Sequence, residues 1–207
     1  KYQLPIETFD GPQQERFRKQ LSRKDELHRV LSLAAGWFHS QINSSVGSEA
    51  SNYLFKKRGF SRNIVQSFQL GYAPDKWDGL LQYLQDVEKI SLEIIEAVGL
   101  IIPRKDRSGF YDRFRNRIIV PIRDQQGRVI GFGGRSLDGS EPKYLNSPET
   151  EIFEKGKHLF GLDKAANSIR KNDCAVVVEG YFDVIALHEV GIENSVASLG
   201  TALSSQQ

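Results

Sequence analysis

Residues 174–178 read Cys-Ala-Val-Val-Val and are followed directly by Glu179 and Gly180. A short, continuous apolar run is typical of a strand that is buried on both faces of a parallel sheet. The next residues predict a helix that ends at Gly191, and residues 195–199 predict a second strand. Strand, helix and strand in this order form a βαβ unit, so we expect a parallel sheet in this part of the chain.

Two carboxylates lie at the start of this helix. Glu179 comes immediately after the first strand, and Asp183 lies about one helical turn further on. Ligands of open α/β sheets bind outside the carboxyl ends of the strands, so we expect both carboxylates to face one cleft. There they can bind a hard divalent cation or transfer protons. The helix dipole alone also favours acidic residues at this place, and the pattern leaves both interpretations open.

The upstream half is predicted to be mostly helical. Residues 1–14 have the composition of a linker, and a long helix is expected after them. Its apolar face is predicted to consist of Leu27, Val30, Leu31, Ala34, Trp37, Phe38 and Ile42. Shorter helices are expected after the N-caps Ser48 and Ser61, with Gly59 and Gly71 ending them, and over residues 77–84 and 91–98. No internal repeat is evident.

A β-hairpin is expected between the helical half and the βαβ unit. Residues 110–122 predict one strand and residues 128–134 the return strand. Arg113, Arg115 and Arg117 alternate along the first strand, which places them on one face as a phosphate-binding strip. A plain solvated face is the alternative. Ser147 is expected to cap a further helix.

Composition and charge exclude several classes of protein. The chain has 207 residues, of which 39% are hydrophobic and 26% charged, which is typical of a folded protein. No apolar run reaches the roughly 18 residues of a membrane span. A single cysteine, Cys174, excludes an internal disulfide and a cysteine-rich zinc site, and a reducing cytoplasm is the default compartment. Because the chain contains no methionine, we expect an internal piece of a longer protein, with N-terminal processing as the alternative.

The charges are distributed unevenly along the chain, although the net charge is only +2. Residues 104–135 carry nine Lys or Arg against three Asp or Glu, whereas residues 136–207 carry six against eleven. Basic segments attract phosphates through long-range fields and counterion release. The basic segment therefore favours nucleic-acid binding, with a solvated surface as the alternative.

Several blocks of the sequence resemble bacterial DNA primases. The block Val177 to Leu187 is similar to the first motif of the TOPRIM fold. Further blocks follow the order of the primase family, namely residues 56–59, 70–74, 112–124, 127–135, 142–150, 153–162 and 197–201. The resemblance covers about residues 10–207. Other TOPRIM proteins, such as topoisomerases, recombination mediators and phage primases, are the alternatives, and residues 142–150 favour the bacterial branch.

The resemblance implies an α+β fold. A linker over residues 1–14 would precede a mixed helical and β-hairpin N-terminal subdomain over residues 15–170. The first βαβ unit of a TOPRIM α/β sheet would follow over residues 171–207. Zn²⁺ belongs to a separate N-terminal domain in this family. The family's later Asp-x-Asp cluster does not occur in the chain, so we expect the chain alone to be inactive, or to act only as a nucleic-acid-binding module.

The implied activity is the synthesis of short RNA primers from NTPs on a single-stranded DNA template. It implies Mg²⁺ or Mn²⁺ as cofactor, a replicative helicase as partner through another region, and no membrane partner. Glu179 matches the family's metal-binding catalytic glutamate, and Asp183 matches a nearby acid. The positions that match nucleotide-binding residues are Arg58, Arg135, Lys143, Tyr144 and Asn146. Arg113, Arg115 and Arg117 match nucleic-acid-binding positions.

Overall fold

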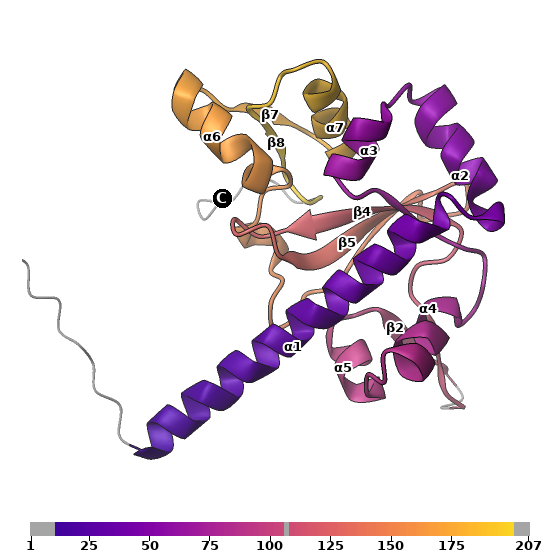
Figure 1. Cartoon of the computed structure of the whole chain (residues 1–207), viewed down its shortest axis with the longest axis vertical. Helices are drawn as coiled ribbons and strands as arrows, with labels where there is room; N and C mark the ends of the chain where they lie inside the picture. The colour runs from indigo at the N-terminus through magenta and orange to yellow at the C-terminus, as the bar shows by residue number, and fades with distance from the viewer. Residues whose placement is uncertain (1–10, 106–107, 201–207) are drawn as a thin grey trace, which may run out of the picture.

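The computed structural model describes residues 11–105 and 108–200, and it combines helices with small sheets (Figure 1). The longest described helix is α1 (Gly11–Gln41), whose N-terminal part extends away from the rest of the molecule (Figure 1). The expected linker overlaps the first residues of this helix, and residues 1–10 lie outside the described residues. The predicted apolar face is confirmed, since Leu27, Ala34 and Phe38 are fully or almost fully buried.

Two segments of the helical half fold alike, 30 residues apart in the sequence. Each contains a short α-helix, a π-helical turn, a second short helix and a strand. The first segment consists of α2 (Ser48–Asn52), η2 (Tyr53–Lys57), α3 (Arg62–Ser67) and β1 (Gly71–Ala73). The second consists of α4 (Gly79–Gln82), η3 (Tyr83–Val87), α5 (Leu92–Ala97) and β2 (Ile101–Pro103). The prediction that the chain has no internal repeat is therefore wrong at the level of structure.

The two copies share backbone detail as well as order. Gly59 and Lys89 occupy the same left-handed position, with φ of 71° and 58°. Gln69 and Gly99 occupy a second one, with φ of 51° and 71°. Identical residues occur only at the pairs Tyr53/Tyr83, Leu54/Leu84, Ser61/Ser91, Ile64/Ile94 and Leu70/Leu100. Because most paired positions differ in residue type, the sequence alone does not display the repeat.

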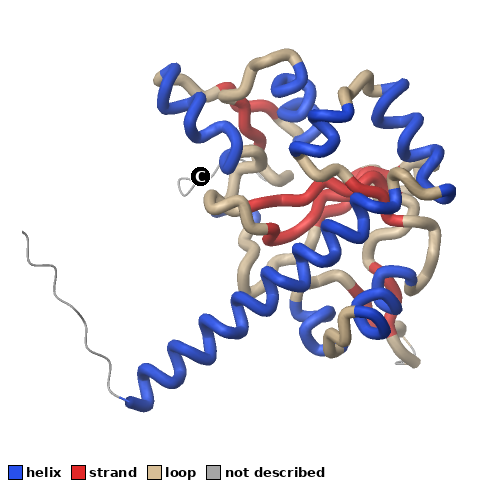
Figure 2. Tube along the Cα trace, in the orientation of Figure 1, coloured by secondary structure: helices blue, strands red, loops and turns tan. Residues whose placement is uncertain are grey.

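The largest sheet is antiparallel and has the strand order β1-β4-β5-β6. Figure 2 draws the strands in red. Its hairpin consists of β4 (Arg117–Arg123) and β5 (Val129–Ser136), joined by the predicted turn at Gly127, and β6 (Tyr144–Asn146) forms one edge. A separate two-stranded sheet pairs β2 with β3 (Phe110–Asp112). Helix α1 crosses one face of the large sheet, where Phe38 lies 5.4 Å from Phe132 between ring centres.

The βαβ unit predicted from the sequence is confirmed. After η4 (Lys155–Lys157) and α6 (Leu162–Asn172), β7 (Val176–Val178), α7 (Tyr181–Glu189) and β8 (Ser195–Ala197) follow, with the strands parallel. Burial of β7 on both faces is wrong, because Val177 is 49% exposed. Val178 packs against the core, whereas Val177 is not among the residues of the core cluster or those packed against it.

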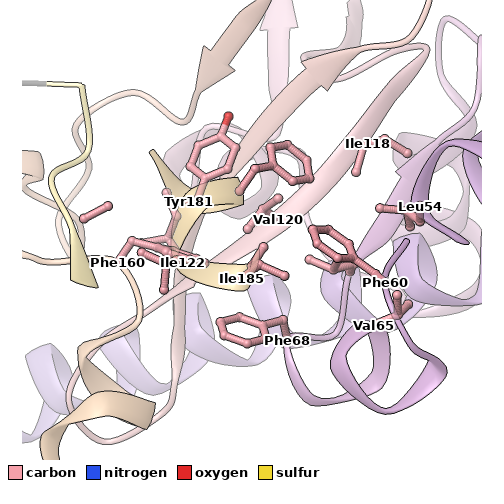
Figure 3. Packing of buried hydrophobic residues seen from close by; sticks show 14 of the residues in the cluster. Leu54, Phe60, Val65, Phe68, Ile118, Val120, Ile122, Phe160, Tyr181 and Ile185 are labelled. Atoms are coloured by element: carbon pink, nitrogen blue, oxygen red, sulfur yellow. The ribbon is translucent and has the colours of Figure 1, made fainter. Parts of the chain in front are cut away.

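The βαβ unit packs on the large sheet through apolar side chains. Tyr181 and Ile185 of α7 lie against Val120 and Ile122 of β4, with Leu54 and Phe60 from the first repeat copy closing the cluster (Figure 3). Phe60 and Phe182 are stacked, with ring centres 6.4 Å apart. This packing fixes the carboxyl ends of β7 and β8 beside the edge strand β6.

Four local predictions are wrong. Ser48 is the first residue of α2 and makes no capping hydrogen bond, so Gly47 occupies the N-cap position. Gly71 belongs to β1, and the left-handed residue after α3 is Gln69. Ser147 begins no helix, because its buried Oγ accepts a hydrogen bond from the backbone N–H of Phe132. By contrast, Ser61 caps α3 as predicted, accepting from the N–H of Ile64.

The fourth wrong prediction is the continuous strand over residues 110–122. Asn116 has a φ of 48°, which breaks the extended backbone between β3 and β4. The two halves of the predicted strand therefore belong to different sheets.

Candidate nucleotide and nucleic-acid site

A pocket of about 350 Å³ lies at the carboxyl ends of β7 and β8. Its lining comes from the βαβ unit, the edge strand β6 and the first repeat copy. The lining residues are Arg58, Tyr144, Asn146, Glu179, Gly180, Tyr181, Phe182, Asp183, Ser198, Leu199 and Gly200. The structure thus confirms that Glu179 and Asp183 face one cleft, as the strand-end rule predicted.

Strand β6 is tied to the loop after β8. The side-chain Nδ2 of Asn146 donates to the backbone oxygen of Leu199 at 3.2 Å. Asn146 pairs with Gly133 of β5 in the sheet register, and Gly133 makes room for Tyr181. A Cβ at position 133 would lie 2.6 Å from the Tyr181 ring, so only glycine permits this packing.

Arg58 follows the π-helical turn η2 and reaches the pocket over aromatic rings. Its Nε donates to the phenol oxygen of Tyr53 at 2.8 Å. Its guanidinium carbon lies 4.8 Å from the ring centre of Phe182, within the range of a cation–π interaction. These contacts hold a cation at the pocket wall and leave its other N–H groups available for a ligand.

Arg135 and Lys143 were expected in the same site, but neither lines the pocket. The Arg135 guanidinium lies between the rings of Tyr53 and Tyr144, at 5.3 and 5.2 Å, and donates to the Tyr144 hydroxyl. Lys143 is exposed, with its Nζ 5.9 Å from the Tyr144 ring centre. Both cations therefore lie beside the Tyr144 ring, outside the residues that line the pocket.

The carboxylates of Glu179 and Asp183 are solvent-exposed and form no ion pair among the described residues. Two hard oxygen donors fit a Mg²⁺ ion, which typically takes one or two carboxylates and completes its shell with water and substrate phosphates. Within residues 11–105 and 108–200, no group of three or more His, Cys, Asp or Glu side chains is placed to hold a metal. Tyr181 is buried, and this burial raises the pKa of its phenol.

The expected strip of three arginines on one strand face is wrong, because only Arg117 belongs to a strand. Arg113 donates from Nε to the backbone oxygen of Gly99 at 2.7 Å. The buried Arg117 donates to the backbone oxygen of Pro142 at 2.8 Å, and burial lowers the pKa of both Arg113 and Arg117. Two of the three arginines are therefore structural, although the sequence pattern made them equivalent.

Arg115 belongs to a different arrangement, which we call the aromatic–arginine platform: Trp77, Arg104, Tyr111 and Arg115. The guanidinium of Arg115 lies 4.4 Å from the Trp77 ring centre and 5.0 Å from that of Tyr111. Arg104 lies at 5.7 and 5.8 Å from the same rings, and Trp77 is 58% exposed. Sequence reasoning missed the platform because its residues come from three places in the sequence. The pairing of β2 with β3 brings Arg104 near Tyr111, and the hydrogen bond from the Asp112 N–H to the Trp77 oxygen brings Trp77 beside them.

The comparisons with known proteins agree with this arrangement. A Toprim domain matches residues 173–207, the part of the chain that contains the βαβ unit. The DNA primase catalytic core, N-terminal domain, matches residues 37–166, more than half of the chain. The chain therefore belongs to the DNA primase catalytic core family.

Named relatives and solved structures support this assignment. The chain is 51% identical over all its 207 residues to a DNA primase of Synechococcus elongatus, covering 30% of that protein. The RNA polymerase domain of Mycobacterium tuberculosis primase DnaG, solved with a double-stranded DNA oligomer with a 6-nucleotide overhang, has a TM-score of 0.82. It is 38% identical, and the match covers 88% of this chain and 56% of that one.

A DnaG primase catalytic domain bound to single-stranded DNA has a TM-score of 0.81 at 38% identity. That match covers 90% of this chain and 57% of the other. The chain spans about a third of the length of the curated relatives it matches. None of its described helices has the length and apolar character of a membrane span.

Proposed function

We propose that this chain is part of a primase that makes RNA primers from NTPs on single-stranded DNA, and that the pocket binds the nucleotide. The observation that carries the proposal is the convergence of two carboxylates, Glu179 and Asp183, with Arg58 in one cavity. Such a combination suits a triphosphate with its metal ion, because the carboxylates bind the cation and the arginine binds phosphate oxygens.

The residues have distinct roles in this proposal. Glu179 and Asp183 hold Mg²⁺ or Mn²⁺, which when bound stabilises negative charge on the attacking and leaving oxygens. Arg58, braced by Tyr53 and Phe182, orients the phosphates through its planar fork. Tyr144 is half exposed at the pocket rim and provides a ring on which a base can stack.

We infer that the template is bound at the aromatic–arginine platform. Exposed aromatic rings stack on bases of any sequence, and arginines beside them neutralise phosphates. Two similar primase domains were solved with DNA, which supports a DNA-binding role for this fold. We assign template binding to Arg115 rather than to Arg113 or Arg117, because the Arg115 guanidinium lies over the exposed ring of Trp77. All three guanidinium groups donate to a backbone oxygen, which in the case of Arg115 is that of Asp112.

The remaining expectations concern the whole protein. We propose that it acts in the cytoplasm at the replication fork together with a replicative helicase, and we assign no described residue to that contact.

The test uses the complete gene product with a single-stranded template, NTPs and Mg²⁺. Glu179→Gln should reduce the rate of primer synthesis at least 100-fold and leave the affinity for the template unchanged. A rate loss of about this size is typical when one group that stabilises charge in the transition state is removed. Glu193→Gln is the matched control, because Glu193 is an exposed carboxylate of the same unit outside the pocket. Full activity of Glu179→Gln would refute the assignment of the pocket.

A second candidate function is nucleic-acid binding without catalysis, which is favoured by the separation of the platform from the pocket lining. In that case the complete gene product would bind single-stranded DNA and make no primers. The same assay therefore distinguishes the two functions.

A further inference from the structure

The start of the edge strand β6 is the part of the pocket rim that carries Tyr144. This strand has only three residues, and within the described residues it pairs with β5 alone. Its last residue, Asn146, is tied to the loop after β8 by the hydrogen bond to Leu199. Tyr144 stands at the opposite end of the strand and is 46% exposed, so its position depends on what holds that end.

Arg117 of the inner strand β4 holds that end. Its aliphatic stem lies against Gly134 of β5, where an added Cβ would be only 3.1 Å from Arg117 Cδ. Its Nη1 then donates to the backbone oxygen of Pro142 at 2.8 Å, two residues before Tyr144. The side chain therefore reaches from β4 past β5 to the segment that enters β6, and it attaches an edge strand to a strand that is not its neighbour.

Asn116 fixes an earlier part of the same connection between β5 and β6. Its Nδ2 donates to Oδ2 of Asp138 at 3.1 Å, and its backbone oxygen accepts from the N–H of Leu137 at 3.3 Å. Asn116 also has the left-handed backbone that interrupts the extended chain before β4. This break separates Arg115, which belongs to the platform, from Arg117, which reaches the connection to β6.

The burial of the Arg117 cation indicates more than support for a loop. The residue is 6% exposed, burial lowers its pKa, and it forms no ion pair among the described residues. Burying a guanidinium without such a partner is unfavourable, and a neutral donor can also bond a backbone oxygen. The charge acts on the pocket wall instead. Burial raises the pKa of the Tyr181 phenol, and the nearby charges of Arg117 and Arg135 oppose this rise.

The Tyr144 ring depends on the backbone that Arg117 fixes. Apart from its pairing with Arg135 in the sheet, Tyr144 is held by contacts between side chains. Its ring lies 5.9 Å from that of Tyr181, and the guanidinium of Arg135 lies 5.2 Å from it. Such contacts adjust when the backbone shifts, whereas the bond from Arg117 to Pro142 restrains the backbone itself. Without this bond, the ring at the pocket rim would lose its fixed direction.

We propose that Arg117 is a positioning residue for nucleotide binding, which holds Pro142 and thereby keeps Tyr144 in the orientation that the base of the nucleotide meets. This inference rests on the proposed function, and it assigns a role at the pocket to a residue that does not line it.

The test measures equilibrium binding of ATP with Mg²⁺ to the complete gene product, together with its affinity for single-stranded DNA. Arg117→Met should weaken ATP binding roughly tenfold, because small displacements of a positioned group strongly reduce its contribution, and should leave the affinity for DNA unchanged. In a Tyr144→Ala background, the same substitution should weaken ATP binding by less than about twofold, because the residue through which Arg117 acts is already absent.

Arg123→Met is the matched control. Arg123 stands at the other end of β4 and donates to the backbone oxygen of Gly127 at 2.6 Å, outside the pocket lining. Both substitutions should lower the unfolding temperature, but only Arg117→Met should weaken ATP binding. If Arg117→Met does not fold, Arg117→Lys and Arg123→Lys are compared in the same measurements, with the same expectation.

Three results would each overturn the inference: unchanged ATP affinity in the Arg117 variant, an equal loss in the Arg123 variant, or the full tenfold loss in the Tyr144→Ala background. If the wild type binds ATP, the proposed pocket stands whatever the Arg117 variant does. If the wild type binds no ATP, the proposed function fails and this inference fails with it.

Discussion

The buried carboxyl group of Asp112 should make this chain less stable as the pH rises from about 4 to 7, whereas most carboxylates have the opposite effect. Asp112 is 3% exposed and accepts from the backbone N–H groups of Leu80 and Leu81 at 2.8 and 3.0 Å. Its own N–H donates to the backbone oxygen of Trp77, so it also positions the platform. Burial raises the pKa of this carboxyl from 3.8 to about 6, against the lowering effect of the two N–H groups.

The magnitude follows from the size of the pKa shift. Each unit corresponds to about 1.4 kcal/mol, so a shift of roughly two units amounts to about 3 kcal/mol. The folded state holds the proton more tightly than the unfolded state. The contribution to stability is therefore fully present below about pH 4 and is lost as the pH rises through about 6.

Urea unfolding of wild type and Asp112→Asn between pH 4 and pH 7 measures this effect. The variant cannot titrate at this position, so the difference in unfolding free energy, wild type minus variant, should fall by about 2.5 kcal/mol between pH 4 and pH 7. Other groups that titrate in both proteins cancel in this difference. A difference that stays constant, or that rises with pH, would show that burial does not govern the ionisation of Asp112.

Three further pairs of substitutions test other parts of the structure. Trp77→Ala should lower the affinity for single-stranded DNA by about 1–3 kcal/mol, and Trp77→Phe should restore most of it; equal affinities measured by fluorescence anisotropy would exclude stacking at the platform. Gly133→Ala should lower the free energy of unfolding in urea by roughly 1–3 kcal/mol, because the new methyl group would clash with the ring of Tyr181. Gly36→Ala in α1 should raise the same free energy by about 1 kcal/mol, because no atom lies near its new methyl group. Lys89→Gly should raise the unfolding free energy by about 1 kcal/mol by relieving a left-handed backbone, and the reciprocal Gly59→Lys should lower it; the opposite signs would contradict the equivalence of the two repeat copies.

The sequence predicted those parts of the fold that depend on residues close together in the sequence. The βαβ unit follows from an apolar run, a helix and a second apolar run, and Glu179 follows from the rule that places ligands at strand ends. The strand break at Asn116 was not predictable, because asparagine adopts both extended and left-handed backbone. Ser147 was misassigned because its partner, the N–H of Phe132, is distant in sequence.

The candidate site divides in the same way. The carboxylates were predicted from topology, and Arg58, Tyr144 and Asn146 from the family resemblance. Arg58 contacts Tyr53 of η2 and Phe182 of α7, which belong to different elements. The rings of Tyr53 and Phe182 come into contact only when α7 packs on the first repeat copy. Alternation misassigned Arg113 and Arg117 because it assumes a regular strand, and the backbone is regular only from Arg117 onward.

The repeat explains why Arg58 stands where it does. In the first copy the residue five positions after the tyrosine of the π-helical turn is Arg58, which donates to Tyr53. In the second copy it is Glu88, which accepts from Tyr83 at 2.7 Å. The equivalent backbone of the two copies therefore places Arg58 and Glu88 in the same position relative to the tyrosine. The copy that lies beside the carboxylates presents the cation to which we assign phosphate binding in the proposed function, whereas the copy that lies beside α1 presents an anion to Arg29, 4.0 Å away. The same structural unit thus places a cation in the lining of the pocket in one copy and an anion beside α1 in the other, and the two copies differ in the sign of the charge at this position.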